Sequence, residues 1–194
     1  MNSTGDWDIT GTWSLSTTVY ISAPSSLETH YTGVVTALIK TSTIPIASVK
    51  EGRIVTYCRS TIMNSYCFIV FRYQDASNYY YVKWEPNTWL PDGQVLFSVH
   101  RVKDGSDTQI GFASPKGFNT TGWFLIRVTW WNDYVGLVIR FEYWDGSAWQ
   151  KGCADVYDTN NYWKDIGGRV GLFLHCGDAT YHVWVDDTYI YGIG

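Results

Sequence analysis

Residues 67–84 read CFIVFRYQDASNYYYVKW, two runs of alternating apolar and polar residues on either side of the turn signal Asp75-Ala76-Ser77-Asn78. Neighbouring residues of a strand point to opposite faces, so this alternation predicts two antiparallel strands with one buried face. With the turn at 75–78, Arg72 pairs with Tyr81 and Phe71 pairs with Val82. The predicted apolar face consists of Cys67, Ile69, Phe71, Tyr73, Tyr80, Val82 and Trp84. The predicted open face consists of Phe68, Val70, Arg72, Tyr79, Tyr81 and Lys83.

A second hairpin is predicted over residues 123–146, WFLIRVTWWNDYVGLVIRFEYWDG, with its turn near Asn132-Asp133. The same alternation divides its side chains between two faces. The residues expected in the core are Phe124, Ile126, Val128, Trp130, Ile139, Phe141 and Tyr143. The residues expected on the open face are Arg127, Thr129, Trp131, Arg140, Glu142 and Trp144.

Similar alternation and turn signals continue along the rest of the chain, and the sequence contains no convincing helical pattern. Short strands at near-regular spacing are typical of an all-β sandwich or barrel. The 194 residues fit one large all-β domain over 1–194, because no linker, repeat or low-complexity tract divides them. Aromatic residues make up 18% of the chain, more than a core of this size needs, so some are expected on a ligand-binding surface.

Charge and hydropathy argue against a nucleic-acid partner and against a membrane-spanning helix. The formal net charge is −4 and no basic run occurs, which disfavours nucleic acid. No apolar run is long enough for a membrane-spanning helix. The polar start lacks a signal-peptide profile, and Met1 fits either a native start or a start codon added to a domain of a larger secreted protein.

The four cysteines are spaced without a CxxC pair, so a structural zinc site is not expected. Residues 55–70 suggest a hairpin that turns near 62–64 and places Cys58 opposite Cys67, close enough for a disulfide. The alternative is two small buried thiols. An even cysteine count, low charge and many aromatic residues favour an extracellular or cell-surface location. Two sequons, at Asn2 and Asn119, match the glycosylation pattern, although such short motifs often occur by chance.

The two predicted open faces combine flat rings with guanidinium and carboxylate groups. Flat rings stack on the apolar faces of pyranose rings, while charged forks bond the hydroxyl groups. This predicts a polysaccharide or glycan site formed by Arg72, Tyr79, Tyr81, Arg127, Trp131, Arg140, Glu142 and Trp144. Two alternatives remain. One is a solvated face with cross-strand ion pairs, and the other is a structural or adhesive domain whose face contacts protein.

Three phrases carry a family resemblance: FIVFRYQDASNYYYVKW, GWFLIRVTWWNDYVGLVIRFEYWDGSAW and GRVGLFLHCGDATYHVWVDDTYIYG (residues 168–192). In this order they resemble concanavalin A-like jelly rolls, particularly laminin-G-like and carbohydrate-binding members. The resemblance spans about residues 50–192. It implies a β-sandwich of two antiparallel sheets with a concave and a convex face.

Adjacent aspartates in the last predicted strand, Asp186 and Asp187, need compensation, because at least one should point toward the core. The resemblance implies a structural calcium held by Asp186 and by backbone carbonyls of the N-terminal segment. Calcium requires several oxygen ligands, which two carboxylates alone do not supply. The alternative is a carboxylate satisfied by turn amides or by Arg169.

Catalysis is not expected. Retaining glycosidases of this architecture carry paired carboxylates on one strand face, spaced E-x-D-x-E, and no such triplet occurs. The corresponding lyase pattern of Arg, Gln-x-His and a Tyr-rich strand is also absent. The four histidines are scattered, and no serine or cysteine nucleophile motif accompanies them. The sequence therefore predicts a non-catalytic binding module.

Overall fold

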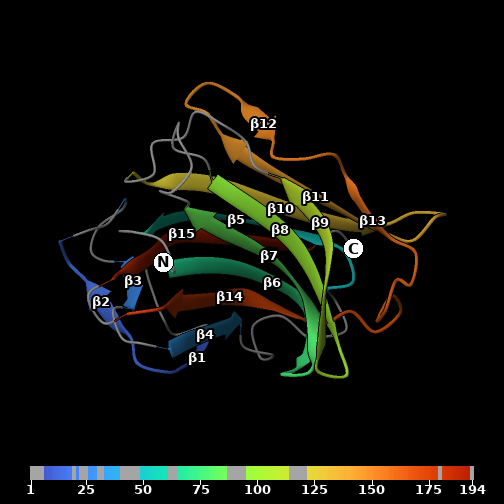
Figure 1. Ribbon diagram of the computed structural model, residues 1–194, viewed down its shortest axis with the longest axis horizontal. Coiled ribbons are helices and arrows are strands. Elements are labelled where there is room, and N and C mark those ends of the chain that lie inside the picture. Colours follow the sequence, from blue (N-terminus) through green and yellow to red (C-terminus); the bar gives the residue numbers. More distant parts are fainter. Residues whose placement is uncertain are drawn as a thin grey trace.

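The computed structural model describes residues 7–18, 21, 26–29, 33–39, 49–60, 65–86, 95–113, 122–178 and 181–192. These residues form two antiparallel sheets packed face to face, and Figure 1 shows one sheet in front of the other. Sheet A has the order β1 (Trp7–Thr10), β4 (Gly33–Ile39), β14 (Arg169–Cys176), β6 (Ser65–Asp75), β7 (Asn78–Pro86), β8 (Val95–Lys103) and β9 (Ser106–Ala113).

Sheet B has the order β12 (Trp149–Lys151), β11 (Leu137–Trp144), β10 (Phe124–Asn132), β5 (Gly52–Ser60), β15 (Val183–Gly192), β3 (Ser26–Thr29) and β2 (Ser14–Ser16). A short strand, β13 (Val156–Asp158), also pairs with β11. The predicted all-β sandwich of two antiparallel sheets is confirmed. Within the described ranges no helix could cross a membrane.

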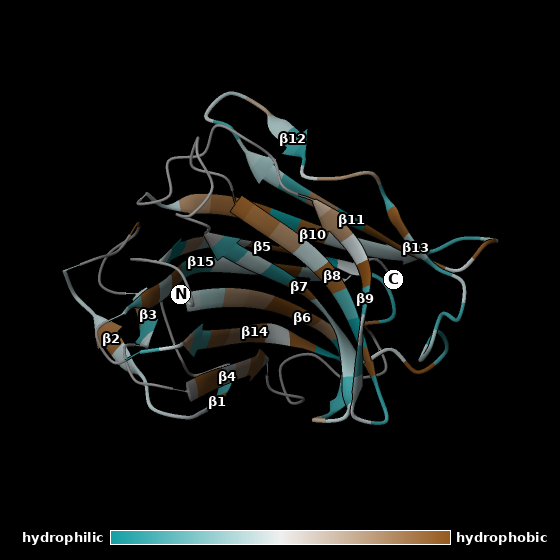
Figure 2. Ribbon diagram, in the orientation of Figure 1, coloured by the Kyte–Doolittle hydropathy of each residue, from teal (hydrophilic) through white to brown (hydrophobic). Residues whose placement is uncertain are grey.

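The core lies between the sheets, and the alternation of buried and partly buried residues is clearest in β5, where every second residue is buried. Figure 2 shows the resulting alternation of apolar and polar segments along the strands. The residues that the second hairpin was expected to bury are buried or packed against the core, from Phe124 to Tyr143. Trp130 is fully buried, stacks on Phe71 with ring centroids 4.8 Å apart, and lies over Gly52. A side chain at Gly52 would collide with that indole, so glycine is required at this position.

The first hairpin forms, with Asp75 opposite Asn78 as predicted, but its register changes along the strands. Phe71 pairs with Tyr80, not with Val82, because a β-bulge at residues 72–74 adds extra residues to β6. At its start Arg72 adopts a φ of 49°, a left-handed conformation that few non-glycine residues take. The bulge moves two side chains to faces other than those predicted. Tyr73 leaves the main core and joins an outer cluster, and Arg72 becomes buried.

The hairpin predicted around residues 62–64 is wrong as a sheet element, because β5 belongs to sheet B and β6 to sheet A. Residues 61–64 lie outside the described part of the chain. The proximity of Cys58 and Cys67 is nevertheless confirmed. Their thiol sulfurs are 2.9 Å apart and fully buried, and they face each other across the core.

A disulfide between these two thiols stays a prediction. We expect a mild disulfide oxidant to link Cys58 to Cys67 with only a small sulfur displacement, because the two side chains already touch. Thiol titration of the oxidised, denatured protein before and after reduction checks this, with Cys58→Ser as the control. Retention of all four thiols after oxidation would contradict it.

Candidate functional site

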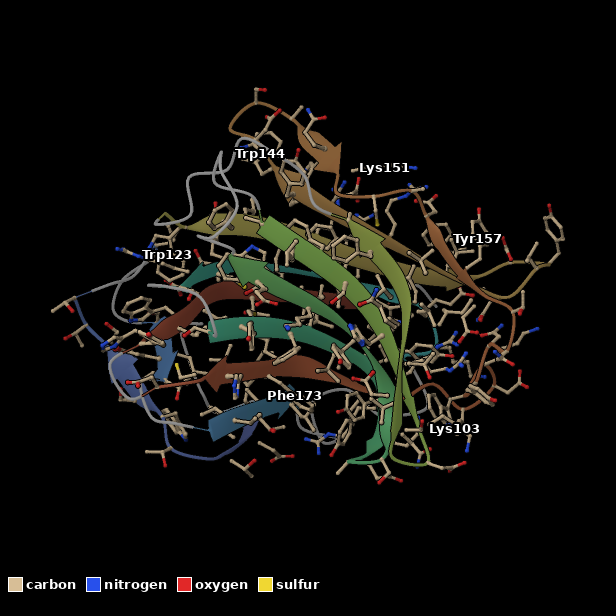
Figure 3. All side chains as sticks on the ribbon, viewed as in Figure 1. Lys103, Trp123, Trp144, Lys151, Tyr157 and Phe173 are labelled. Carbon is tan, nitrogen blue, oxygen red and sulfur yellow. The ribbon has the colours of Figure 1, made fainter. Side chains whose placement is uncertain are left out.

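The predicted site residues lie in three places: the outer face of sheet A, the outer face of sheet B and, for Arg72, a buried position described below. Tyr79 and Tyr81 are on the outer face of β7 in sheet A. Arg127, Trp131, Arg140, Glu142 and Trp144 are on β10 and β11 in sheet B, on the opposite side of the sandwich. In Figure 3, Trp144 and Lys151 both lie at the upper end of the view, around β12, and Phe173 of β14 lies well below them. The prediction that both hairpins contribute to a single ligand-binding face is therefore wrong, because the hairpins belong to different sheets.

The outer face of sheet A carries a layer of aromatic rings. Phe68, Tyr79, Tyr81 and Phe173, with Val34 of β4, line a hollow of about 220 Å³, called the sheet A hollow below. The rings meet edge to face or tilted, as Phe68 and Tyr81 do at 5.3 Å and Tyr79 and Phe173 at 5.6 Å. Edge-to-face contacts are a favourable geometry for aromatic pairs, and they fix these rings to one another.

Polar groups lie beside the sheet A hollow along β7, β8 and β9. The Tyr81 hydroxyl donates to Asp107 Oδ2 at 2.7 Å, and the Tyr81 ring stacks on His100 at 4.5 Å. His100 Nδ1 lies 2.9 Å from Asp107 Oδ1, and its Nε2 lies 2.9 Å from Ser98 Oγ. Each ring of this row is thereby held in a fixed orientation by a hydrogen bond or a stack. Burial raises the pKa of Tyr81, and its bond to Asp107 adds to this shift, so the hydroxyl remains a donor at neutral pH.

Lysine and glutamate extend this polar border. Lys83 Nζ lies 2.8 Å from Glu85 Oε2 and 3.8 Å from the ring centre of Tyr66, and Tyr66 stacks on His175. The outer face of sheet A therefore offers both flat apolar surface and fixed hydrogen-bonding groups.

The outer face of sheet B has a different character. Arg127 donates two hydrogen bonds to Glu142, at 2.7 and 2.6 Å, and Arg140 donates two to Asp155, at 2.9 and 2.7 Å. The same guanidinium groups lie over indole rings, Arg127 over Trp149 at 4.1 Å and Arg140 over Trp131 at 5.1 Å. Both guanidinium groups are already paired with carboxylates. This matches the alternative interpretation from the sequence, a solvated face with cross-strand ion pairs.

Arg72 occupies none of these surfaces, and the prediction that it lies on an open face is wrong. The bulge turns it inward, and it has 0% exposure. Its guanidinium donates to Lys50 O at 3.1 Å, to Asn132 Oδ1 and Asn161 Oδ1 at 2.7 Å each, and to Tyr162 O at 3.2 Å. Burial lowers the pKa of Arg72 to about 10, so the group is still charged at neutral pH. Its role is to join β10, the start of β5 and the loop after β13.

Asp158, at the end of β13, belongs to the same region. Its Oδ2 accepts from the Tyr80 hydroxyl at 2.7 Å, and its Oδ1 accepts from Arg101 at 2.8 Å and from Asn160. Burial alone would raise the pKa of Asp158, but the bonds from Tyr80, Arg101 and Asn160 outweigh it, and the pKa lies below its usual value.

A lowered folded-state pKa stabilises the fold above the unfolded-state value, near pH 4, and this contribution disappears as the pH falls through the folded-state value. We therefore expect the free energy of unfolding to drop below about pH 4. The drop should be smaller in Asp158→Asn, which is already less stable at pH 7. Urea unfolding from pH 7 to pH 2 checks this, with the exposed Asp104→Asn as the control. Parallel curves for all three proteins would contradict it.

Asp186 is fully buried, and both of its carboxylate oxygens accept backbone amides. Ile21 N donates to Oδ2 and Asp187 N donates to Oδ1, each at 2.8 Å. Arg169, the other partner considered from the sequence, forms an ion pair with Asp8. Within the described part of the chain no three metal-ligating side chains gather. Residues 1–6 and 22–25, part of the segment expected to supply calcium-binding carbonyls, lie outside it. The amide contacts match the alternative of a carboxylate satisfied by turn amides.

The sequence did not single out His100, Asp107 or Phe173 for this site. Phe173 was visible in the phrase GRVGLFLHC, where it alternates with Leu172 and Leu174. What was missing was the pairing of β14 with β6, which places Phe173 opposite Phe68. His100 stands opposite Tyr81, and the pairing of β7 with β8 was equally unavailable from alternation alone.

No protein family model matches the chain, and no curated protein matches it by sequence. Solved structures match it in fold. The exoplasmic/lumenal domain of VIP36, in its Ca²⁺/Man-bound form, superposes with a TM-score of 0.57 at 10% identity, over 97% of this chain and 83% of that one. The chain has the concanavalin A-like fold.

Two further structures share this concanavalin A-like sandwich. The CBM2 module of the evolved Dit of Lactobacillus casei BL23 phage J-1 matches with a TM-score of 0.58 at 10% identity, covering 95% of this chain and 81% of that one. Xylan beta-1,4-xylosidase from Bacillus halodurans C-125 matches with a TM-score of 0.59 at 10% identity, covering 86% of this chain but 32% of that one. The chain thus spans about a third of that xylosidase chain. At these identities the likeness concerns the fold.

Proposed function

We propose that the protein is a non-catalytic domain that binds a polysaccharide or glycan in the sheet A hollow. The observation that carries the proposal is the hollow itself, walled by Phe68, Tyr79, Tyr81 and Phe173 and bordered by fixed polar groups. Apolar walls with a few convergent polar groups are typical of ligand sites. Structural neighbours that are lectin or carbohydrate-binding domains support this ligand class.

The VIP36 domain and the CBM2 module match 97% and 95% of this chain, which supports a binding domain without an active site. Of the eight residues proposed from the sequence, Tyr79 and Tyr81 fall in the sheet A hollow. Arg127, Trp131, Arg140, Glu142 and Trp144 on sheet B enter the proposal only as a comparison surface.

The test is binding to a panel of soluble β-glucans, xylans and mannans, followed by isothermal titration with the best ligand. We expect Tyr79→Ala to weaken binding about two- to tenfold, because one stacked ring contributes about 0.5–1.5 kcal/mol. Trp144→Ala, on sheet B, is the matched control and should bind like the wild type.

Loss of binding in Trp144→Ala but not in Tyr79→Ala would move the site to sheet B and overturn the proposal. If no polysaccharide of the panel binds and the protein self-associates in light scattering, the structural or adhesive alternative would be favoured.

Calcium at Asp186 and an extracellular location remain predictions from the sequence. The VIP36 neighbour in its Ca²⁺/Man-bound form supports the calcium prediction at the level of the fold. Melting in calcium against EGTA tests it. A calcium-dependent rise in Tm that Asp186→Asn removes would support calcium binding at Asp186. An unchanged Tm would indicate that the Asp186 carboxylate is satisfied by the two backbone amides alone.

A further inference from the structure

A second pocket lies at the end of the sandwich, where the loop between β10 and β11 meets the loop after β13. Figure 1 shows both loops at the end marked by β13. The pocket has a volume of about 580 Å³, within the range of about 300–1,000 Å³ of small-molecule sites. We call it the end pocket. Its walls are residues 133–136 and residues 159–166.

The two walls of the end pocket are tied together beneath the surface. Arg72 donates to Asn132, next to the first wall, and to Asn161 and Tyr162 in the second. The Tyr80 hydroxyl accepts from Tyr162 N at 3.2 Å while donating to Asp158. The fold therefore places a fully buried charge and a buried tyrosine where they fix the position of both loops.

Backbone strain accompanies these ties. Asn161 has a φ of 43° and Trp163 a φ of 59°, and a left-handed tryptophan is rare. Strained residues of this kind cluster at functional sites. The hydrogen bonds of Arg72 to Asn161 and Tyr162 hold this part of the loop in place beside the pocket.

The lining of the end pocket defines the class of ligand. Tyr134 is 99% exposed at the rim, and Trp163 and Ile166 add apolar surface. Amide and carboxylate groups come from Asn160, Asp133 and Asp165, while Lys164 is the one cation among the lining residues. The acidic balance disfavours an anion, and the wall contains neither a histidine nor a cysteine for a soft metal. Flat rings beside hydrogen-bonding side chains suit a neutral, hydroxyl-rich ligand.

We infer that the end pocket is a second binding site, separate from the sheet A hollow, for one or two neutral sugar residues of a glycan. The two sites differ in a useful way. The lining of the end pocket includes Trp163, whereas no tryptophan is among the described residues that line the sheet A hollow. The inference does not depend on binding in the hollow, and each site can be tested separately.

The experiment is a titration of the ¹⁵N-labelled protein with soluble xylo-, gluco- and manno-oligosaccharides, following the indole N–H resonances. Trp163→Phe assigns the Trp163 resonance. We expect a saturable shift of that resonance, which Tyr134→Ala weakens about two- to tenfold. Tyr157→Ala, an exposed tyrosine on β13 outside the pocket lining, is the matched control and should leave the shift unchanged.

The outcomes separate the two sites. Saturable binding that Tyr79→Ala weakens, with no shift at Trp163, would overturn the end pocket and leave the sheet A proposal standing. A saturable shift at Trp163 that Tyr134→Ala weakens and Tyr79→Ala leaves unchanged supports the end pocket, even if no sugar binds in the sheet A hollow. A shift at Trp163 that Tyr134→Ala leaves unchanged, or no shift with any sugar, would overturn the inference.

Discussion

Arg72→Met should lower the free energy of unfolding by about 3–5 kcal/mol, even though methionine fills much of the same volume. The substitution removes a donor from four oxygens, those of Lys50, Asn132, Asn161 and Tyr162. An oxygen left buried without a donor costs about 1–3 kcal/mol. With several of these four oxygens losing their donor together, the expected total is about 3–5 kcal/mol.

Urea unfolding at pH 7 measures this effect, and Arg140→Met is the matched control. Arg140 also makes two hydrogen bonds to one partner, but its side chain is 35% exposed, so its loss should cost about 1 kcal/mol or less. Equal destabilisation by the two changes would show that Arg72 does not have the buried role described above.

Trp130→Ala should cost about 3–5 kcal/mol, since it removes a fully buried indole between the sheets. The cavity would open between the Phe71 ring and the backbone of Gly52, and Gly52 has no side chain that could move into it. Trp130→Phe should cost less, because it keeps most of the ring volume.

Trp144→Ala is the comparison for this second change. Trp144 lies on the outer face of sheet B with 39% exposure and contacts Trp149 edge to face at 5.7 Å. Its loss should change the free energy of unfolding by less than about 1 kcal/mol. A large loss with Trp144→Ala and a small one with Trp130→Ala would reverse the face assignment of the second hairpin.

Local alternation predicted the faces of β10 and β11 correctly, because no bulge interrupts their pairing. In β6 the same reasoning holds for Cys67, Ile69 and Phe71 and then fails at Arg72. A bulge that begins with an arginine at positive φ has no composition signal, since glycine or asparagine is the usual residue there. The bulge is stabilised by hydrogen bonds from Arg72 to acceptors about 60 to 90 residues away in sequence. Alternation along one hairpin does not reveal such distant partners.

The candidate site was only half predictable for a related reason. Alternation separates the inner from the outer face of one hairpin, but it does not say which hairpins share a sheet. Tyr79 and Tyr81 were correctly placed outside, yet their neighbours proved to be Phe68, Phe173 and His100 instead of Trp131 and Trp144. The pairing of β14 with β6 joins residues about 100 positions apart, and only the folded chain reveals it.

The position of the last two strands has a consequence for how the chain folds. β14 lies between β4 and β6, and β15 lies between β5 and β3, so strands from residues 169–192 occupy interior places in both sheets. Neither sheet can close during synthesis until these residues have left the ribosome. Until then the apolar faces of β5 to β11 have no complete partner. Such long-range pairing slows folding and extends the time for which chains can aggregate. Yield during expression should therefore depend on temperature and chaperone supply more than the stability of the finished domain would suggest.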